Sequence, residues 1–195
     1  MKFIQARFFN RAQRATIDQI VIHDMEYPEI MSAAENVARW FAGPQAPQAS
    51  AHFCVDNADV IQCVREEDIA WHTPGLNATS LGVEHAGYAK QARAEWMDPY
   101  SLAELGVSAK LVAGLCLRWK IPVVWLSADD LKAGKRGITG HKQATDAFRH
   151  GVGHWDPGPN FPIAMYLEWV RAASDLSSDP LPVVLELDDA DWKES

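Results

Sequence analysis

Three residues in separate segments of the chain could together bind a metal ion. His23 ends the apolar run IVIH, His141 follows a glycine in ITGHKQATD, and Asp156 precedes a Pro-Gly pair in HWDPGPNFP. Catalytic zinc sites use three protein ligands of this kind, imidazole nitrogens and carboxylate oxygens, and keep a fourth position for water. Two neutral imidazoles and one carboxylate leave the ion a net positive charge, which lowers the pKa of that water to about 7 and polarises a carbonyl.

Each of these residues also has an ordinary structural interpretation. His23 could be a core histidine with satisfied hydrogen bonds, and His141 could cap a helix. Asp156 could bond its own backbone in a turn, as aspartate before Pro-Gly often does. The prolines on either side of Gly158 would hold that carboxylate in one position. The spacing contains no HExxH motif, so only the combination of the three residues favours a metal site.

The composition is that of an ordinary globular chain with one domain. Its 195 residues are 48% hydrophobic and 23% charged, enough for one core and short for two. The net charge of −8 argues against nucleic acid as a partner, because phosphate contacts need basic patches. No apolar run approaches the roughly 20 residues of a membrane span, so no membrane insertion is expected. The N-terminus lacks the apolar core of a signal peptide, which favours a cytoplasmic location.

The three cysteines are expected to be free. Their number is odd, and a chain without a signal peptide favours reduced thiols. Cys54 and Cys63 flank a hairpin and could approach one another, but small buried apolar residues are the simpler interpretation.

Strand signals are spread along the chain and include one hairpin. Short β-branched or aromatic runs predict strands over residues 3–9, 19–25, 81–87 and 121–127. The segment AHFCVDNADVIQCV predicts two strands joined by a turn at Asp56 to Asp59. His23 stands near the end of the second run, where a strand would present it to solvent or to a cleft.

Helices are predicted between these strands. Two segments with capping-box spacing, Ser32–Glu35 and Ser101–Glu104, predict helices. The second helix is long, to about Lys120, and has a broad buried face. A short helix is expected after residue 127 and a final one over 162–173. Interleaved strands and helices indicate an α/β fold, a single domain with a mixed central β-sheet flanked by helices.

Five motifs in order resemble one enzyme family. They are IVIHDM, SAHFCVDNADVIQCVREEDIAWHTPG, SLGVEHAG, ITGHKQATD and DPGPNFP. Together they resemble the zinc-dependent N-acetylmuramoyl-L-alanine amidases of type 2, which share their fold with the peptidoglycan recognition proteins. The resemblance runs from about Gln19 to Trp169, although the family more often has histidine or a hydroxyl residue where Asp24 stands. It implies an amidase domain over 1–175 and an acidic tail or linker over 176–195.

Carried over residue by residue, the resemblance implies one Zn²⁺ per chain. Its ligands would be His23, His141 and Asp156, the last at a position where the family accepts Asp or Cys. Glu84 corresponds to the carboxylate that takes a proton from the attacking water. His154 stands where many members carry lysine and would stabilise the oxyanion. If His154 must be charged for this, activity is expected to fall at higher pH.

Further residues are expected around the ligands. Trp71, His72 and Asn77 would line the substrate groove, although Trp71 is equally well explained as part of the core. His52 is expected to be structural. His85 should point away from Glu84 on a regular strand, so a place in the core or on the surface is expected.

The implied reaction is hydrolysis of the amide between N-acetylmuramic acid and L-alanine in peptidoglycan. A monomer is expected, alone or within a larger multidomain lysin. A phage endolysin, which stays in the cytoplasm until it is released to the cell wall, would fit the lack of a signal peptide. Two alternatives remain, a module that binds peptidoglycan without cleaving it and an amidase that recycles soluble muropeptides. An unrelated α/β hydrolase would need a nucleophile, and the sequence has no GxSxG motif.

Overall fold

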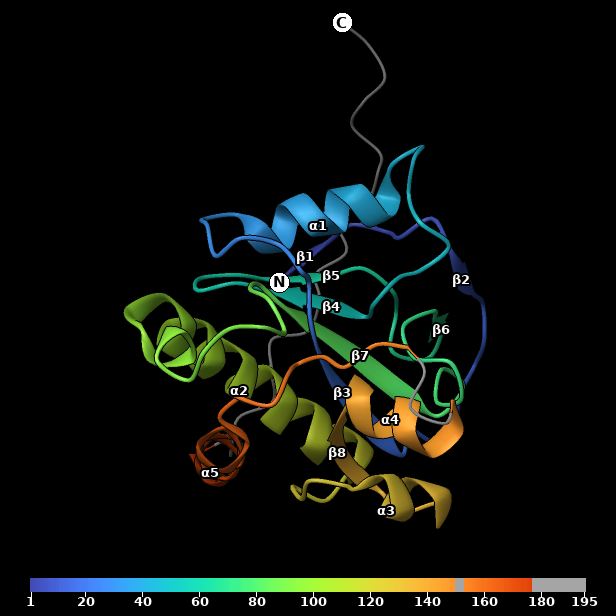
Figure 1. Ribbon diagram of the computed structural model, residues 1–195. Helices are drawn as coiled ribbons and strands as arrows, with labels where there is room; N and C mark the ends of the chain where they lie inside the picture. The colour runs from blue at the N-terminus through green and yellow to red at the C-terminus, as the bar shows by residue number, and fades with distance from the viewer. Residues whose placement is uncertain (150–152, 177–195) are drawn as a thin grey trace, which may run out of the picture.

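The computed structural model describes residues 1–149 and 153–176 and contains a mixed six-stranded sheet covered by helices (Figure 1). The strand order is β1-β5-β4-β7-β3-β8. The strands are β1 (Lys2–Phe3), β3 (Gln19–Asp24), β4 (Phe53–Val55), β5 (Val60–Gln62), β7 (Ser80–His85) and β8 (Gly137–Gly140). Within the described residues, β4 and β5 form the one antiparallel pair of this sheet. Strands β2 (Phe9–Asn10) and β6 (Ile69–Ala70) form a separate two-stranded sheet. The predicted fold class is confirmed.

Helices cover both faces of the sheet (Figure 1). The α-helices are α1 (Ala33–Ala42), α2 (Pro99–Trp119), α3 (Ala128–Lys132), α4 (His141–Phe148) and α5 (Ile163–Leu176), and a 3-10 turn, η1 (Glu95–Met97), precedes α2. Helices α2 and α5 pack with Ile20 and Ile22 of β3 in the main core. Helix α1 packs against Cys54 and Ile61 on the other face. Alternate residues of each strand therefore point to different layers, as strand geometry requires.

Strand β3, an interior strand next to the edge strand β8, carries His23 to the carboxyl edge of the sheet. All six of its residues are buried, and it lies between the parallel strands β7 and β8. The register pairs His23 with Glu84 of β7, so both side chains project from the same face, the one that α1 and α4 flank. The pairing of β3 with β7 therefore places the side chains of His23 and Glu84 next to each other.

Two predicted strands were wrong. The segment predicted over 3–9 contributes only the ends of two separate short strands, β1 and β2. The segment 121–127 forms a single bridge between Trp125 and Ile138. Pro122 has no N–H to give to a neighbouring strand, and the N–H of Val124 donates back to the Pro122 carbonyl at 2.9 Å. This local turn uses backbone groups that a continuous strand would need.

The predicted capping box at the start of α1 was also wrong. Ser32 precedes the helix, but it has φ 67° and its side chain makes no capping hydrogen bond. Glu35 instead pairs with Lys2 at 2.8 Å and with Arg39 one turn further along the helix. A long-range ion pair has therefore replaced the local contact.

Helix α2 begins earlier than its predicted capping box. Pro99 is the first helical residue, and the side chain of Asp98 accepts the N–H of Ser101 at 2.9 Å. Glu104 is buried and accepts the N–H of Ala86, which follows β7. By length and composition alone α2 would suffice to cross a membrane, but most of its apolar residues, among them Leu105 and Val112, are buried in the main core.

The cysteines are free and buried, as expected. Cys54 and Cys63 lie on the hairpin with their Sγ atoms 3.8 Å apart. Cys116 is buried in α2. The predicted tail over 176–195 lies, apart from Leu176, outside the described residues.

His52 is a buried structural histidine, as expected. Its Nδ1 accepts the N–H of Gly82 at 3.0 Å, and its Nε2 donates to the Asp68 carbonyl at 3.2 Å. Burial, and then the nearby Arg14 charge, lower the pKa of His52 to about 3.

We therefore expect metal-free protein to lose stability as the pH falls below about 6.5, the pKa of an unfolded histidine. In that range the unfolded chain binds a proton that the folded protein does not, so His52 lowers the free energy of unfolding by about 1.4 kcal/mol per pH unit. Denaturant unfolding between pH 7 and pH 4, with chelator present, measures this slope. A His52→Gln variant should have a shallower slope even if it is less stable, and an unchanged slope would contradict the assignment.

Candidate active site

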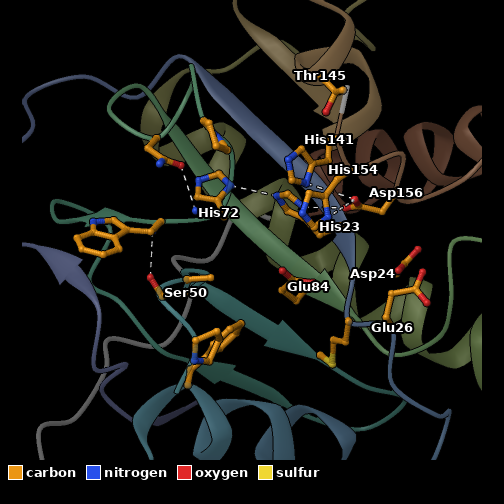
Figure 2. A pocket seen from close by; sticks show the side chains of 18 of the residues that line it. His23, Asp24, Glu26, Ser50, His72, Glu84, His141, Thr145, His154 and Asp156 are labelled. Carbon is orange, nitrogen blue, oxygen red and sulfur yellow. Dashed lines mark hydrogen bonds and ion pairs between the residues drawn. The ribbon is translucent and has the colours of Figure 1, made fainter. Parts of the chain in front are cut away.

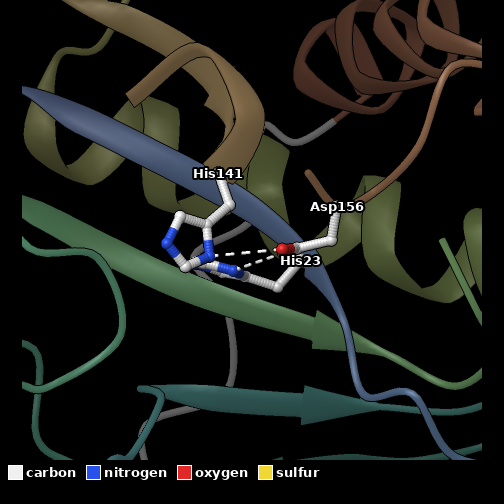
Figure 3. A group of neighbouring side chains, drawn as sticks. All are labelled: His23, His141 and Asp156. Carbon is white, nitrogen blue, oxygen red and sulfur yellow. Dashed lines mark hydrogen bonds and ion pairs between the residues drawn. The ribbon is translucent and has the colours of Figure 1, made fainter. Parts of the chain in front are cut away.

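Three elements bring His23, His141 and Asp156 together (Figure 3). Asp156 Oδ2 accepts a hydrogen bond from His23 Nδ1 at 2.8 Å, and Oδ1 lies 3.3 Å from His141 Nδ1. All three residues are buried, and the atoms that could bind a metal lie within 4.8 Å of one another. No other such group of three or more residues exists in the described part of the chain.

The local structure explains how each ligand is held. Strands β3 and β8 are parallel neighbours, so His23 and His141 stand at the same edge of the sheet. Asp156 lies in a loop that is tied to α4, because the N–H of Lys142 donates to the Asp156 carbonyl at 3.0 Å. Gly158 has φ +87°, and a Cβ there would lie 1.9 Å from the Ala89 carbonyl oxygen. Only glycine permits this close packing of the loop.

The charges of the three residues already suit a metal ion. Burial alone would raise the pKa of Asp156, but hydrogen bonds from His141 and His23 hold it below its usual range. Burial lowers the pKa of His23. The site therefore favours an ionised carboxylate beside a neutral imidazole, the protonation states that metal binding requires. Two imidazole nitrogens and one carboxylate oxygen also form a common donor set for catalytic zinc.

His72 lies behind His23 and contacts it directly. His23 Nε2 lies 3.1 Å from His72 Nδ1 and 3.2 Å from Thr73 Oγ1, and His72 Nε2 lies 3.2 Å from Ser80 Oγ. Gly82 leaves room for the ring, since a Cβ there would lie 2.6 Å from His72 Cγ. Both ring nitrogens of His72 thus have partners inside the protein. The predicted substrate contact stays a prediction, and the geometry favours support of His23.

Trp71 and Asn77 both line the cleft, where a substrate contact was predicted. The Trp71 indole N–H donates to Asn10, and its ring stacks on Phe8 with centroids 5.9 Å apart. Asn77 Oδ1 accepts the N–H groups of His72 and Thr73 at 3.0 and 2.6 Å. Asn77 therefore shapes the turn that carries His72, and Trp71 forms part of the wall.

Glu84 lies in the same cleft as the three candidate ligands (Figure 2). Its Oε2 is buried and has no hydrogen-bond partner among the described residues. Burial, followed by the charges of Asp156 and Asp24, raises the pKa of Glu84 well above its usual value. A carboxylate with a raised pKa and a free oxygen is suited to exchanging protons with a substrate or water.

His154 lies at the rim of the site. Its side chain is 75% exposed, with Nδ1 3.8 Å from Asp156 Oδ1. Its ring stacks on His141, with centroids 4.6 Å apart and an interplanar angle of 4°. This places the imidazole next to the candidate metal site with an open face, and its oxyanion role stays a prediction. His85 is buried, as a core histidine would be. Its Nδ1 donates to the His23 carbonyl at 2.9 Å, and its Nε2 accepts from the Ser108 hydroxyl at 2.6 Å.

The three candidate ligands, together with His72, Glu84 and His154, line a cleft of about 1160 Å³. Trp71 and Asn10 line one part of it, while Asp24, Glu26 and Lys90 line another. Glu26 was not expected from the sequence to be near the site, because it follows the strand in an unpredicted turn with φ 48°. Asp24 was visible in the sequence only as a residue that departs from the family pattern.

Comparison with known proteins identifies the family. Residues 13–159 match the Amidase_2 family of N-acetylmuramoyl-L-alanine amidases. N-acetylmuramoyl-L-alanine amidase A of Achromobacter lyticus is 30% identical over 165 residues, which are 78% of this chain and 82% of that protein.

Solved structures share the fold at lower sequence identity. The Staphylococcus aureus hydrolase AmiA in complex with its ligand has a TM-score of 0.67 and 17% identity, over 89% of this chain and 82% of that chain. The Ph2119 endolysin from a Thermus scotoductus bacteriophage has a TM-score of 0.52 and 16% identity, over 83% of this chain and 89% of that chain.

Proposed function

Because the chain belongs to the N-acetylmuramoyl-L-alanine amidase family, we propose that a zinc ion held by His23, His141 and Asp156 serves its reaction. The protein is an amidase that cleaves peptidoglycan at the bond between N-acetylmuramic acid and L-alanine. The observation that carries the zinc proposal is the buried group of two imidazole nitrogens and one carboxylate oxygen, with Nδ1 of both histidines facing Asp156.

The residues around this group have separate tasks in the proposed mechanism. Zinc at this site would lower the pKa of a water to about 7 and polarise the amide carbonyl. Glu84 Oε2, which lacks a partner, accepts a proton from the attacking water and delivers it to the nitrogen of the leaving L-alanine. His154 donates an N–H to the developing oxyanion.

Chelation and zinc restoration test this proposal directly. The protein is incubated with peptidoglycan after treatment with a chelator, and again after zinc is added back. We expect free peptides that begin with L-alanine, detected by mass spectrometry, to disappear with the chelator and return with zinc. Cleavage that persists after complete removal of metal would refute the zinc proposal. Tight binding to cell wall with one zinc per chain and no cleavage would favour a recognition module instead.

For the biological setting we propose an endolysin-like role, with the enzyme in the cytoplasm until it is released to the cell wall. The support is a fold shared with a bacteriophage endolysin. The main alternative is an amidase that recycles soluble muropeptides. Rates on intact sacculi and on soluble muropeptides separate the two, since an endolysin-like enzyme should lyse intact sacculi efficiently. Rapid cleavage of soluble fragments alone would favour recycling.

We expect His72→Ala to weaken zinc binding by about 10–100-fold, the usual effect of removing a partner that orients a metal-bound histidine. If zinc were bound through His23 Nδ1, which faces Asp156, the proton of the neutral ring would be on Nε2, and His72 Nδ1 lies 3.1 Å from that atom. Competition with a chromogenic chelator measures the affinity. In the matched variant Ser80→Ala, which removes the hydroxyl beside the other ring nitrogen of His72 and its hydrogen bond to the Leu76 carbonyl, a smaller loss is expected. If His72→Ala binds zinc normally but has a raised KM, the predicted substrate contact would be the better assignment.

A further inference from the structure

Asp24 is a buried carboxylate in the cleft that the proposed mechanism does not use. The residue is 6% exposed, and neither carboxylate oxygen has a hydrogen-bond partner. The backbone N–H groups of Glu26 and Ala89 face this carboxylate and lower its pKa, but neither forms a hydrogen bond with it by distance and angle, and the Ala89 N–H donates to Glu26 Oε1 instead. No ion pair to it is found among the described residues. A buried carboxylate without partners is costly, so a group from outside the chain that pairs with Asp24 would stabilise this part of the cleft.

The surroundings of Asp24 favour a cation. Its carboxylate lies beside that of Glu26, on the side of the site away from the imidazoles of His23 and His141 (Figure 2). The charges nearest to it are those of Asp156 and Glu26, both negative. Lys90 also lines the cleft, but it directs its Nζ over the Tyr88 ring, 5.3 Å from the centroid.

The geometry does not favour a second metal ion as the occupant. The residues that could bind a metal in the described part of the chain are His23, His141 and Asp156, and Asp24 is not in that group. Glu26 Oε1 already accepts the N–H of Ala89 at 3.1 Å. An ammonium group suits the arrangement better, because it brings three N–H donors and does not need several ligand atoms arranged around it as a metal ion does.

We propose that Asp24, with Glu26 at the rim, binds a primary ammonium group in the peptide half of the substrate. This inference rests on the amidase function. The glycan beside the scissile amide has no amino group free to carry charge, whereas the stem peptide does. The side-chain amine of its diamino acid, two residues after L-alanine, is one source. The α-amine that cleavage frees on L-alanine is the other.

This assignment also gives the substrate a direction in the cleft. His72, which follows Trp71 in the chain, lies on the opposite side of His23 from Asp24 (Figure 2). The peptide would therefore extend toward Asp24 and Glu26, and the glycan toward Trp71, whose indole can stack on a sugar ring.

The first test uses two muramyl tripeptides with L-lysine as the third residue, one with a free side-chain amine and one with that amine acetylated. If the side-chain amine is bound, zinc-loaded wild-type enzyme should have a kcat/KM about tenfold higher for the free amine, the effect of one charge-assisted hydrogen bond. Asp24→Asn should lose this preference, and Glu26→Gln should reduce it. The matched control Asp129→Asn removes an exposed carboxylate on α3 outside the cleft and should keep it.

The second test distinguishes the α-amine. Inhibition by the product tripeptide is compared with inhibition by the same peptide acetylated at its α-amine. If that amine is bound, acetylation should weaken inhibition of the wild type about tenfold and have little effect on Asp24→Asn. If neither acetylation matters in the wild type, or if Asp24→Asn keeps both preferences, the inference is overturned while the amidase activity stands. Absence of cleavage of either substrate would instead count against the proposed function, and peptide binding would still test Asp24.

Discussion

Replacement of Glu84 by Gln is expected to lower kcat by about 10²–10⁴-fold, the usual contribution of a general base, with zinc still bound. The register of β3 and β7 places Glu84 beside His23, yet Glu84 is not part of the metal-binding group. Glutamine keeps the shape of the side chain but cannot accept the proton of the attacking water. Because burial penalises the charge of Glu84, the substitution should leave the free energy of unfolding unchanged or increase it.

Steady-state kinetics and zinc content together check this expectation. Glu104→Gln is the matched control, since Glu104 is also a buried carboxylate with a raised pKa, but it accepts the Ala86 N–H on the far side of the sheet. That variant should change stability more than kcat. A Glu84→Gln enzyme with nearly normal kcat would remove Glu84 from the mechanism. Loss of zinc from Glu84→Gln would show that the carboxylate supports the metal site instead.

The fold could be predicted because its signals are local. Three such signals are the β-branched run around Ile20 and Ile22, the hairpin turn at Asp56 to Asp59 and the apolar periodicity of α2. Each depends on residues within one short segment of the chain. Two helix starts were mispredicted because a distant partner replaced a local one. Glu35 pairs with Lys2 instead of capping its own helix, and Glu104 accepts a hydrogen bond from the end of β7. Sequence periodicity contains no information about such partners.

In the candidate site too, the residue types could be predicted from the sequence, whereas the contacts between distant residues could not. The residue types of His23, His141 and Asp156 indicated metal chemistry, but His23 and Asp156 are 133 positions apart, and only the sheet topology brings them into contact. The support of His23 by His72 depends on the missing side chain of Gly82, a contact that no spacing rule predicts. The lack of a hydrogen-bond partner for the Asp24 carboxylate is likewise visible only in the folded protein.

Asp156 should be the most sensitive of the three ligands, and Asp156→Ala is expected to abolish zinc binding and activity. It is the one anionic ligand, and both histidines depend on it for their orientation through contacts at 2.8 and 3.3 Å. Its loss should exceed the 10–100-fold effect on metal affinity that is usual for an outer partner such as His72. Metal content and peptide release, measured on the same samples, check both expectations.

Asp156→Cys separates loss of a ligand from damage to the loop. A thiolate is a good zinc ligand, so cysteine can replace the carboxylate as a donor to the metal. The Cys variant should therefore retain zinc and a measurable part of the activity, whereas Asp156→Asn, closer in shape but neutral, should lose both. If Asn preserved zinc better than Cys, the carboxylate would act by holding His23 and His141 in place. The metal would then have to be bound by the histidines with some other ligand.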